Sequence, residues 1–149
     1  MISVELIKEL RASTGAGVSD VKRALEESGG DRAKAEAALE KKLGSSALKR
    51  AGRETQAGVV AAYIHANGKI GALVQVSCET DFVARTAEFI GMAHDIAMQI
   101  AAMEPADVAA LLAQPFIKDQ NKTAGGIINE AIGRFGENIT IERFTRYGA

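Results

Sequence analysis

The sequence contains one cysteine, no tryptophan and two prolines among its 149 residues. The single cysteine, Cys78, excludes an internal disulfide and is typical of a reducing compartment. No run of about 18 apolar residues is present, so the sequence predicts no membrane span. The first residues enter helical periodicity without a basic and apolar leader, so we expect no signal peptide. We therefore expect a soluble protein of the cytoplasm.

Neither sign of charge is in large excess, because 18 basic and 19 acidic residues give a formal net charge of −1. This balance gives no general reason to expect nucleic acid or an anionic membrane as a partner. The charge is unevenly spread, since residues 1–53 hold 11 basic and 8 acidic side chains and residues 54–149 hold 7 and 11. Such an asymmetry indicates two structural units.

Signatures of catalysis are also missing. The glycines at 15, 17, 125 and 126 match neither a dinucleotide fingerprint nor a Walker motif. His65 and His94 lie far apart in the sequence, one on an expected strand and one in an expected helix, and neither has metal-ligand spacing. We therefore expect no cofactor, no metal site and no enzymatic activity, and the pattern favours a binding protein.

The first 44 residues predict a bundle of three short helices. Ser3 and Asp31 are the expected N-caps of the first and third helices. Gly15 and Gly17 permit a sharp reversal with positive φ, and Gly44 is the expected end of the third helix. The residues expected to face the bundle core are Leu6, Ile7, Leu10, Val18, Val21, Ala24, Leu25, Ala35, Ala38 and Leu39.

After a small, polar and basic linker, predicted at 45–56 with some helical character, the period changes. Two β-rich runs at 58–66 and 69–77 flank Asn67-Gly68, a pair that predicts a hairpin with a type I′ turn. Helices are expected at 86–103, at 106–113 and from Thr123 to Gly136, followed by a third strand at the C-terminal end. The residues expected to point inward from these helices are Phe89, Ile90, Ala93, Ile96, Ala97, Ile100, Ile127, Ile128, Ala131, Ile132 and Phe135.

Together these elements predict an α+β fold. A three-helix domain at 1–44 precedes a core domain at 57–149, which has an antiparallel sheet of about three strands with helices on one face. A sheet of three strands in so small a core leaves a face or an edge uncovered, which favours a homodimer.

The join between the second strand and the long helix carries Asp81 next to Phe82, where a turn normally prefers small polar residues. Phe82 either packs into the core, as a phenylalanine after a strand usually does, or is held out for a partner. A basic run, Lys41, Lys42, Lys49, Arg50 and Arg53, leaves open an RNA-binding alternative, although no aromatic residues interleave with it for base stacking.

Four segments in order carry a resemblance to a known family: LRASTGAGVSDVKRAL at 10–25, VQVSCETDFVAR at 74–85, QPFIKD at 114–119 and GENITIERF at 136–144. The chain resembles the elongation factor Ts family, whose members are guanine-nucleotide exchange factors of elongation factor Tu. The resemblance implies a ubiquitin-associated-like N-terminal bundle followed by an α+β core. A helix-, peptide- or RNA-binding module without exchange activity is the alternative.

The resemblance also implies two partner-binding sites. Thr80, Asp81, Phe82 and Val83 would enter the nucleotide-binding domain of elongation factor Tu, where the phenylalanine wedges between helices, disturbs the magnesium site and loosens GDP. In the N-terminal domain Leu10 and Val18 would be the apolar contacts, and Gly15, Ala16 and Gly17 would shape the loop. For Leu10 the alternative is a place in the bundle core.

The chain departs from the family pattern at three points. Ser19 stands where family members often carry a second large apolar residue beside Val18. Many relatives have a longer helical insertion after the position of Met103, and some duplicate the core, whereas this chain has one core. Relatives with a single core can pair two chains, so the resemblance also favours a homodimer.

Overall fold

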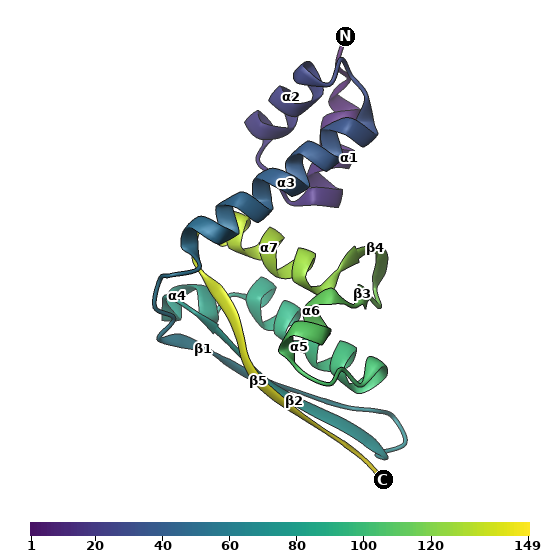
Figure 1. Cartoon of the computed structure of the whole chain (residues 1–149), viewed down its shortest axis with the longest axis vertical. Helices are drawn as coiled ribbons and strands as arrows, with labels where there is room; N and C mark the ends of the chain where they lie inside the picture. The colour runs from purple at the N-terminus through teal and green to yellow at the C-terminus, as the bar shows by residue number, and fades with distance from the viewer. The chain divides into compact units, whose positions relative to one another are not determined.

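The computed structural model describes residues 1–149 and confirms the predicted α+β class, with seven helices, a three-stranded antiparallel sheet and a two-stranded sheet (Figure 1). Spatial contacts group the chain into two compact units. The first contains Met1–Gly52 and Asn129–Gly136, and the second contains Arg53–Ile128 and Glu137–Ala149. The predicted domain boundaries, 1–44 and 57–149 with a linker between them, stay a prediction.

The first unit contains the three predicted N-terminal helices, and their caps explain where they begin. The Ser3 hydroxyl accepts a hydrogen bond from the Leu6 amide at 3.1 Å, and the Asp31 carboxylate accepts one from the Lys34 amide at 3.1 Å. Gly15 ends the first helix with φ of 71°. The helices are α1 (Val4–Thr14), α2 (Val18–Glu27) and α3 (Arg32–Arg50), and their buried core consists of Leu10, Ala16, Val21, Ala24, Leu25, Ala35 and Leu39.

Four local predictions for this unit are wrong. α3 does not end at Gly44 but continues to Arg50, because a glycine in a helix costs only about 1 kcal/mol and ends the helix only where the chain turns left-handed. Gly17 has φ of −65°, so Gly15 alone supplies the left-handed turn. Val18 and Ala38 are exposed, because each lies on the solvent side of its helix.

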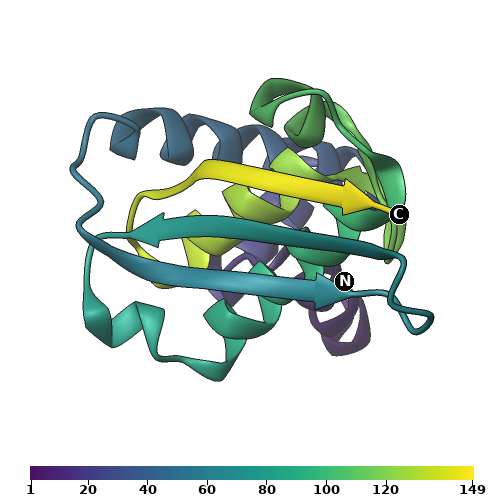
Figure 2. The same cartoon turned by 90° about the horizontal axis from the view of Figure 1, so that it is seen from below.

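The second unit is built on three antiparallel strands in the order β1, β2, β5, and Figure 2 shows them side by side with α5 behind them. α5 packs against β1 and β2, and its Phe89, Ala93, Ile96 and Ile100 are wholly buried, as predicted. Ile90 is exposed instead of inward-facing. The elements are β1 (Ala57–Ile64), β2 (Ile70–Cys78), β5 (Ile139–Gly148) and α5 (Ala87–Met103).

The predicted hairpin is present, but its turn is not type I′. A type I′ turn needs positive φ at both Asn67 and Gly68, whereas only Gly68 has it. The Gly68 amide donates to the His65 carbonyl at 2.7 Å, and the Lys69 amide donates to Oδ1 of Asn67 at 3.0 Å. The loop is therefore longer than two residues, and the asparagine side chain replaces one backbone bond.

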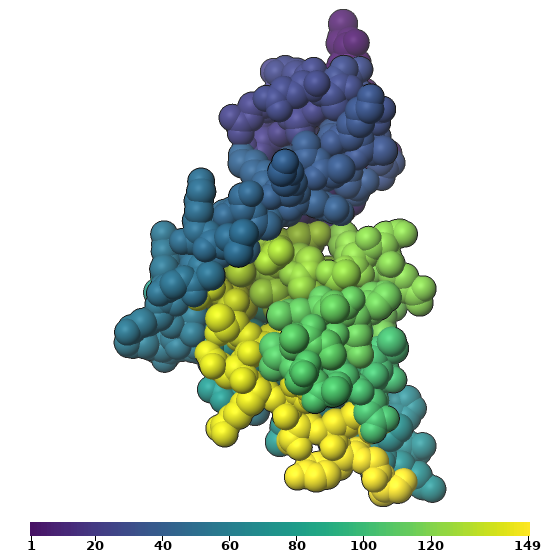
Figure 3. All heavy atoms as spheres, in the orientation of Figure 1, coloured from purple at the N-terminus to yellow at the C-terminus, as the bar shows by residue number.

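Four short elements complete the second unit, and the sequence predicted one of them, α6. The buried Gln99 of α5 fixes a small hairpin, since its Nε2 donates to the Pro115 carbonyl at 3.0 Å and its Oε1 accepts from the Ile117 amide at 2.8 Å. α6 lies against β5, where the space-filling view shows them in contact (Figure 3). The elements are α4 (Asp81–Ala84), α6 (Val108–Ala113), β3 (Pro115–Phe116) and β4 (Asp119–Thr123).

The last helix, α7 (Ala124–Phe135), begins as predicted, with the Thr123 hydroxyl accepting from the Gly126 amide at 3.0 Å. Its Ile128, Ala131 and Ile132 are buried. Among all seven helices, none has the combination of length and apolar character that spanning a membrane requires.

Candidate partner-binding site

The join between β2 and α5 forms a single helical turn, α4, with one face buried and one exposed. The Thr80 hydroxyl caps it by accepting from the Val83 amide at 3.4 Å. Val83 and Ala84 are only 5% and 4% exposed, and α4 lies against β1 and β2. Phe82, in contrast, is 84% exposed. The turn therefore holds a large apolar side chain out in water while its neighbours anchor it.

This geometry decides between the two alternatives for Phe82. The core alternative is wrong, because the side chain contributes little to the packing of its own chain. Val83 is buried, so within the predicted set it anchors the turn and is not presented to a partner. Thr80 and Asp81 are exposed, as a partner-binding role requires. Whether this turn binds a partner stays a prediction.

The backbone before α4 is held by a residue that the sequence did not indicate. Oε1 of Glu137 accepts hydrogen bonds from the amides of Glu79 and Thr80 at 3.1 and 3.0 Å, and its Oε2 accepts from the Thr80 hydroxyl at 2.7 Å. Glu137 lies in the GENITIERF segment that carries part of the resemblance. Its place in this segment is the only signal in the sequence that singles out Glu137, because no sequence pattern pairs residues so far apart.

Cys78 also holds the backbone of Thr80 in place. Its thiol donates to the Thr80 carbonyl at 3.3 Å. Burial raises the pKa of Cys78 above its ordinary value, and the nearby carboxylate of Glu137 acts in the same direction. The thiol is therefore protonated at neutral pH and acts as a small buried donor.

The predicted residues of the N-terminal domain are only partly at the surface. Leu10 is fully buried in the bundle, so the core alternative holds and Leu10 presents no surface to a partner. Ala16 is also buried, and its amide donates to the Thr14 hydroxyl at 3.2 Å. Val18 is 49% exposed and Gly17 is exposed. Val18 is therefore the apolar side chain that this loop offers.

Several side chains of the basic run are engaged within the chain. Lys42 bonds to Asp20, Arg50 bonds to Ser46, and an Nη of Arg53 lies 3.5 Å from a carboxylate oxygen of Glu79. The hydrogen bond from Lys42 lowers the pKa of Asp20 below its ordinary value, against the opposing effect of burial. Lys42 and Arg53 are thus paired with carboxylates of this chain and Arg50 with a hydroxyl, and whether the run binds RNA stays a prediction.

The two histidines, which are distant in sequence, meet at one tyrosine. The Tyr63 hydroxyl and Nδ1 of His65 are 3.2 Å apart, and the rings of Tyr63 and His94 are edge-to-face with centroids 5.9 Å apart. Sequence spacing could not show this, because β1 and α5 bring the residues together only in the fold. No third metal ligand joins them.

An exposed aromatic side chain on an anchored turn is suited to bind a partner, because aromatic side chains are enriched among the residues that carry most of the binding energy at interfaces. Comparison with known proteins identifies the family. A model of the family described as "Elongation factor TS" matches residues 79–149. Elongation factor Ts of Thermotoga petrophila is 42% identical over 189 aligned positions, covering 98% of this chain and 95% of the relative.

Other relatives agree. Elongation factor Ts of Syntrophomonas wolfei is 43% identical over 192 positions (99% of this chain, 90% of the relative), and that of Rubrobacter xylanophilus is 41% identical over 189 (97% of each). The chain belongs to the elongation factor Ts family of translation elongation factors. Since 189 aligned positions exceed the 149 residues of the chain by 40, these relatives contain at least that many residues without a counterpart here.

Proposed function

We propose that this protein is a guanine-nucleotide exchange factor in the cytoplasm that binds GDP-bound elongation factor Tu and accelerates GDP release, so that GTP can bind. It acts by binding and catalyses no chemical step. The observation that carries the proposal is Phe82, 84% exposed on a turn whose other apolar side chains are buried. Family membership supports the choice of elongation factor Tu as the partner.

The proposed mechanism needs no catalytic group. A magnesium ion bridging the phosphates is among the largest local charges at a bound nucleotide. A small displacement of its ligands therefore weakens nucleotide binding strongly. When Phe82 inserts between helices of the partner, it displaces them toward the arrangement that holds magnesium poorly.

The size of the effect follows from the exposed side chain. Burying a phenylalanine that is almost fully in water is worth roughly 1.5–3 kcal/mol. If Phe82 finds its pocket only in the distorted partner, this energy shifts the partner by roughly 10- to 150-fold toward that state. By linkage, GDP lowers the affinity for this protein by the same factor by which this protein lowers the affinity for GDP. Larger accelerations require further contacts, for which exposed Val18 is a candidate.

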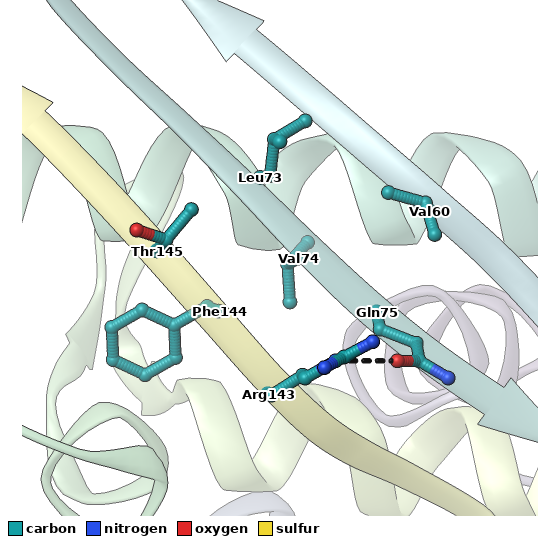
Figure 4. A pocket seen from close by; sticks show the side chains of 7 residues that line it. All are labelled: Val60, Leu73, Val74, Gln75, Arg143, Phe144 and Thr145. Carbon is teal, nitrogen blue, oxygen red and sulfur yellow. Dashed lines mark hydrogen bonds between the residues drawn. The ribbon is translucent and has the colours of Figure 1, made fainter.

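We also propose that two copies of this chain pair through the sheet face opposite α5. Figure 4 shows that face with the helices behind it, and the Arg143 side chain donates to the Gln75 side chain across β2 and β5 at 3.0 Å. The same face also carries exposed apolar side chains. In a two-fold dimer, the same face of the second copy would cover them. The exposed apolar residues on this face are Val60, Ile64, Leu73 and Tyr147.

The exchange proposal is tested by release of labelled GDP from purified elongation factor Tu. The protein should accelerate release at micromolar concentration, and Phe82→Ala should lower the acceleration by about 10-fold or more. Leu48→Ala is the matched control, because it removes a comparably exposed apolar side chain from α3. No acceleration by the unaltered protein would exclude the exchange function. An equal loss in both variants would exclude the special role of Phe82.

A further inference from the structure

Two segments far apart in sequence are joined next to Phe82 by reciprocal hydrogen bonds. The Glu137 carboxylate accepts three, two from the successive amides of Glu79 and Thr80 and one from the Thr80 hydroxyl. In return, Oε1 of Glu79 accepts from the Asn138 amide at 2.7 Å. The side-chain amide of Asn138 donates to the Arg53 carbonyl at 2.9 Å. These bonds tie the residues between β2 and α4 to the residues that immediately precede β5.

These bonds leave Thr80 almost no freedom. Its amide and hydroxyl donate to Glu137, and its hydroxyl also accepts from the Val83 amide. Its carbonyl accepts from the Ala84 amide at 3.2 Å and from the Cys78 thiol at 3.3 Å. All of its polar groups are therefore used, two residues before Phe82.

We infer that Glu137 is a positioning residue that fixes the backbone of α4 so that Phe82 projects in the direction required for insertion into the partner. The inference rests on the proposed exchange function. A single helical turn is not stable in isolation, because the cost of nucleation exceeds the gain from its few hydrogen bonds. Without a fixed start, the turn would fray, and the partner would have to order it on binding. Glu137 removes that cost in advance.

Core stability does not explain this arrangement. Two of the three donors, the Thr80 amide and hydroxyl, are exposed, where water could satisfy them, and the third, the Glu79 amide, is part-buried. Charged acceptors with several donors make strong and directional bonds, so their effect here is to fix geometry. We therefore expect a variant without the Glu137 carboxylate to fold but to insert Phe82 into the partner poorly.

The test compares Glu137→Ala with Glu142→Ala, which removes the same charge from the same segment five residues later, at an exposed position of β5. With labelled GDP and elongation factor Tu, Glu137→Ala should lower the release rate at saturating protein by about 10-fold, and Glu142→Ala by less than about 2-fold. The half-saturating concentration should change less than the maximal rate, because Phe82 is inserted only in the distorted state. Equal rates for Glu137→Ala and the unaltered protein would overturn the inference.

A double-mutant cycle separates positioning from general damage. If Glu137 acts through Phe82, then Glu137→Ala should cost less than about 2-fold once Phe82→Ala is present. Independent, multiplicative losses would show a merely structural role and overturn the inference. Should Glu137→Ala fail to fold, Glu137→Gln keeps the side chain's size and one acceptor. Hydrogen exchange at the Glu79 and Thr80 amides should then be faster than in the unaltered protein, and unchanged exchange would refute the proposed clamp.

Failure of the exchange function itself gives a different result. In that case the unaltered protein would not accelerate GDP release, and amide exchange alone would report on Glu137. If the unaltered protein is active, the comparison of Glu137→Ala with Glu142→Ala decides the inference independently.

Discussion

Two phenylalanines, seven residues apart, should respond to the same substitution in opposite ways. Phe82 on α4 is 84% exposed, and Phe89 on α5 is 0% exposed. Truncating a fully buried phenylalanine to alanine costs about 3–5 kcal/mol through lost transfer free energy and a cavity. Truncation at an exposed position usually changes stability by less than about 0.5 kcal/mol. Phe82→Ala should therefore be neutral for folding, and Phe89→Ala severe.

The difference is large on the scale of the whole fold. Domains are stable by about 5–15 kcal/mol, so a loss of about 3–5 kcal/mol in Phe89→Ala is about a fifth of that or more. Urea unfolding should show a lower midpoint with an unchanged slope for Phe89→Ala, and nearly superimposable curves for Phe82→Ala and the unaltered protein. The melting temperature of Phe82→Ala should stay within a few degrees, because about 1 kcal/mol corresponds to roughly 2–8 °C in domains of this size range.

The GDP-release assay is the second measurement, because Phe82→Ala should keep its fold and lose most of its exchange activity. A Phe82→Ala variant that unfolds with a loss of several kcal/mol would show that the side chain is buried in solution. A variant that is both stable and fully active would show that Phe82 is exposed for no reason connected with exchange. Either result would refute the reasoning.

Four further changes have definite expected outcomes. Gly58→Ala should destabilise the fold by about 2 kcal/mol or more in urea unfolding, because φ is 151° and a Cβ would lie 2.3 Å from a backbone oxygen of β2. Asp20, whose pKa is lowered chiefly by Lys42, stabilises the fold above its unfolded pKa of about 3.9. The stability difference between the unaltered protein and Asp20→Asn should vanish as the pH falls through the folded pKa. Leu73→Glu should abolish dimers in sedimentation at micromolar concentration, and monomers of the unaltered protein would contradict the proposed pairing. Alkylation of Cys78 should be much slower in the folded than in the urea-unfolded protein, because the thiol is buried and its pKa is raised.

Local signals predicted most of the fold. Ser3, Asp31 and Thr123 cap helices where the sequence places them, since a side-chain oxygen reaching an amide three residues on is a short-range interaction. The predictions failed where tertiary contacts decide. The hairpin of β3 and β4 is held by Gln99 from α5, and no local pattern reveals that contact.

The candidate site shows the same division. Motif resemblance identified the segment around Phe82, and the structure shows which residues in it are exposed. The clamp by Glu137 was not predicted, because it joins side chain and backbone across 57 residues and depends on the pairing of β2 with β5. Leu10 was placed at a partner surface by resemblance, although its helical spacing with Leu6 and Ile7 already indicated the bundle core.

The geometry of one helical turn explains why an acid and a phenylalanine stand together in this segment. Successive residues of an α-helix are rotated by about 100°, so three consecutive side chains span about 200° and cannot all face the same surface. Once Val83 and Ala84 face β1 and β2, Phe82 must point elsewhere, and it points to solvent. Asp81 occupies the first turn, where a negative charge is favoured near the positive end of the helix dipole. Thr80 then supplies the cap and, through Glu137, the anchor. Each residue type in the segment thus follows from the requirement to hold one apolar side chain in water on a turn too short to form alone.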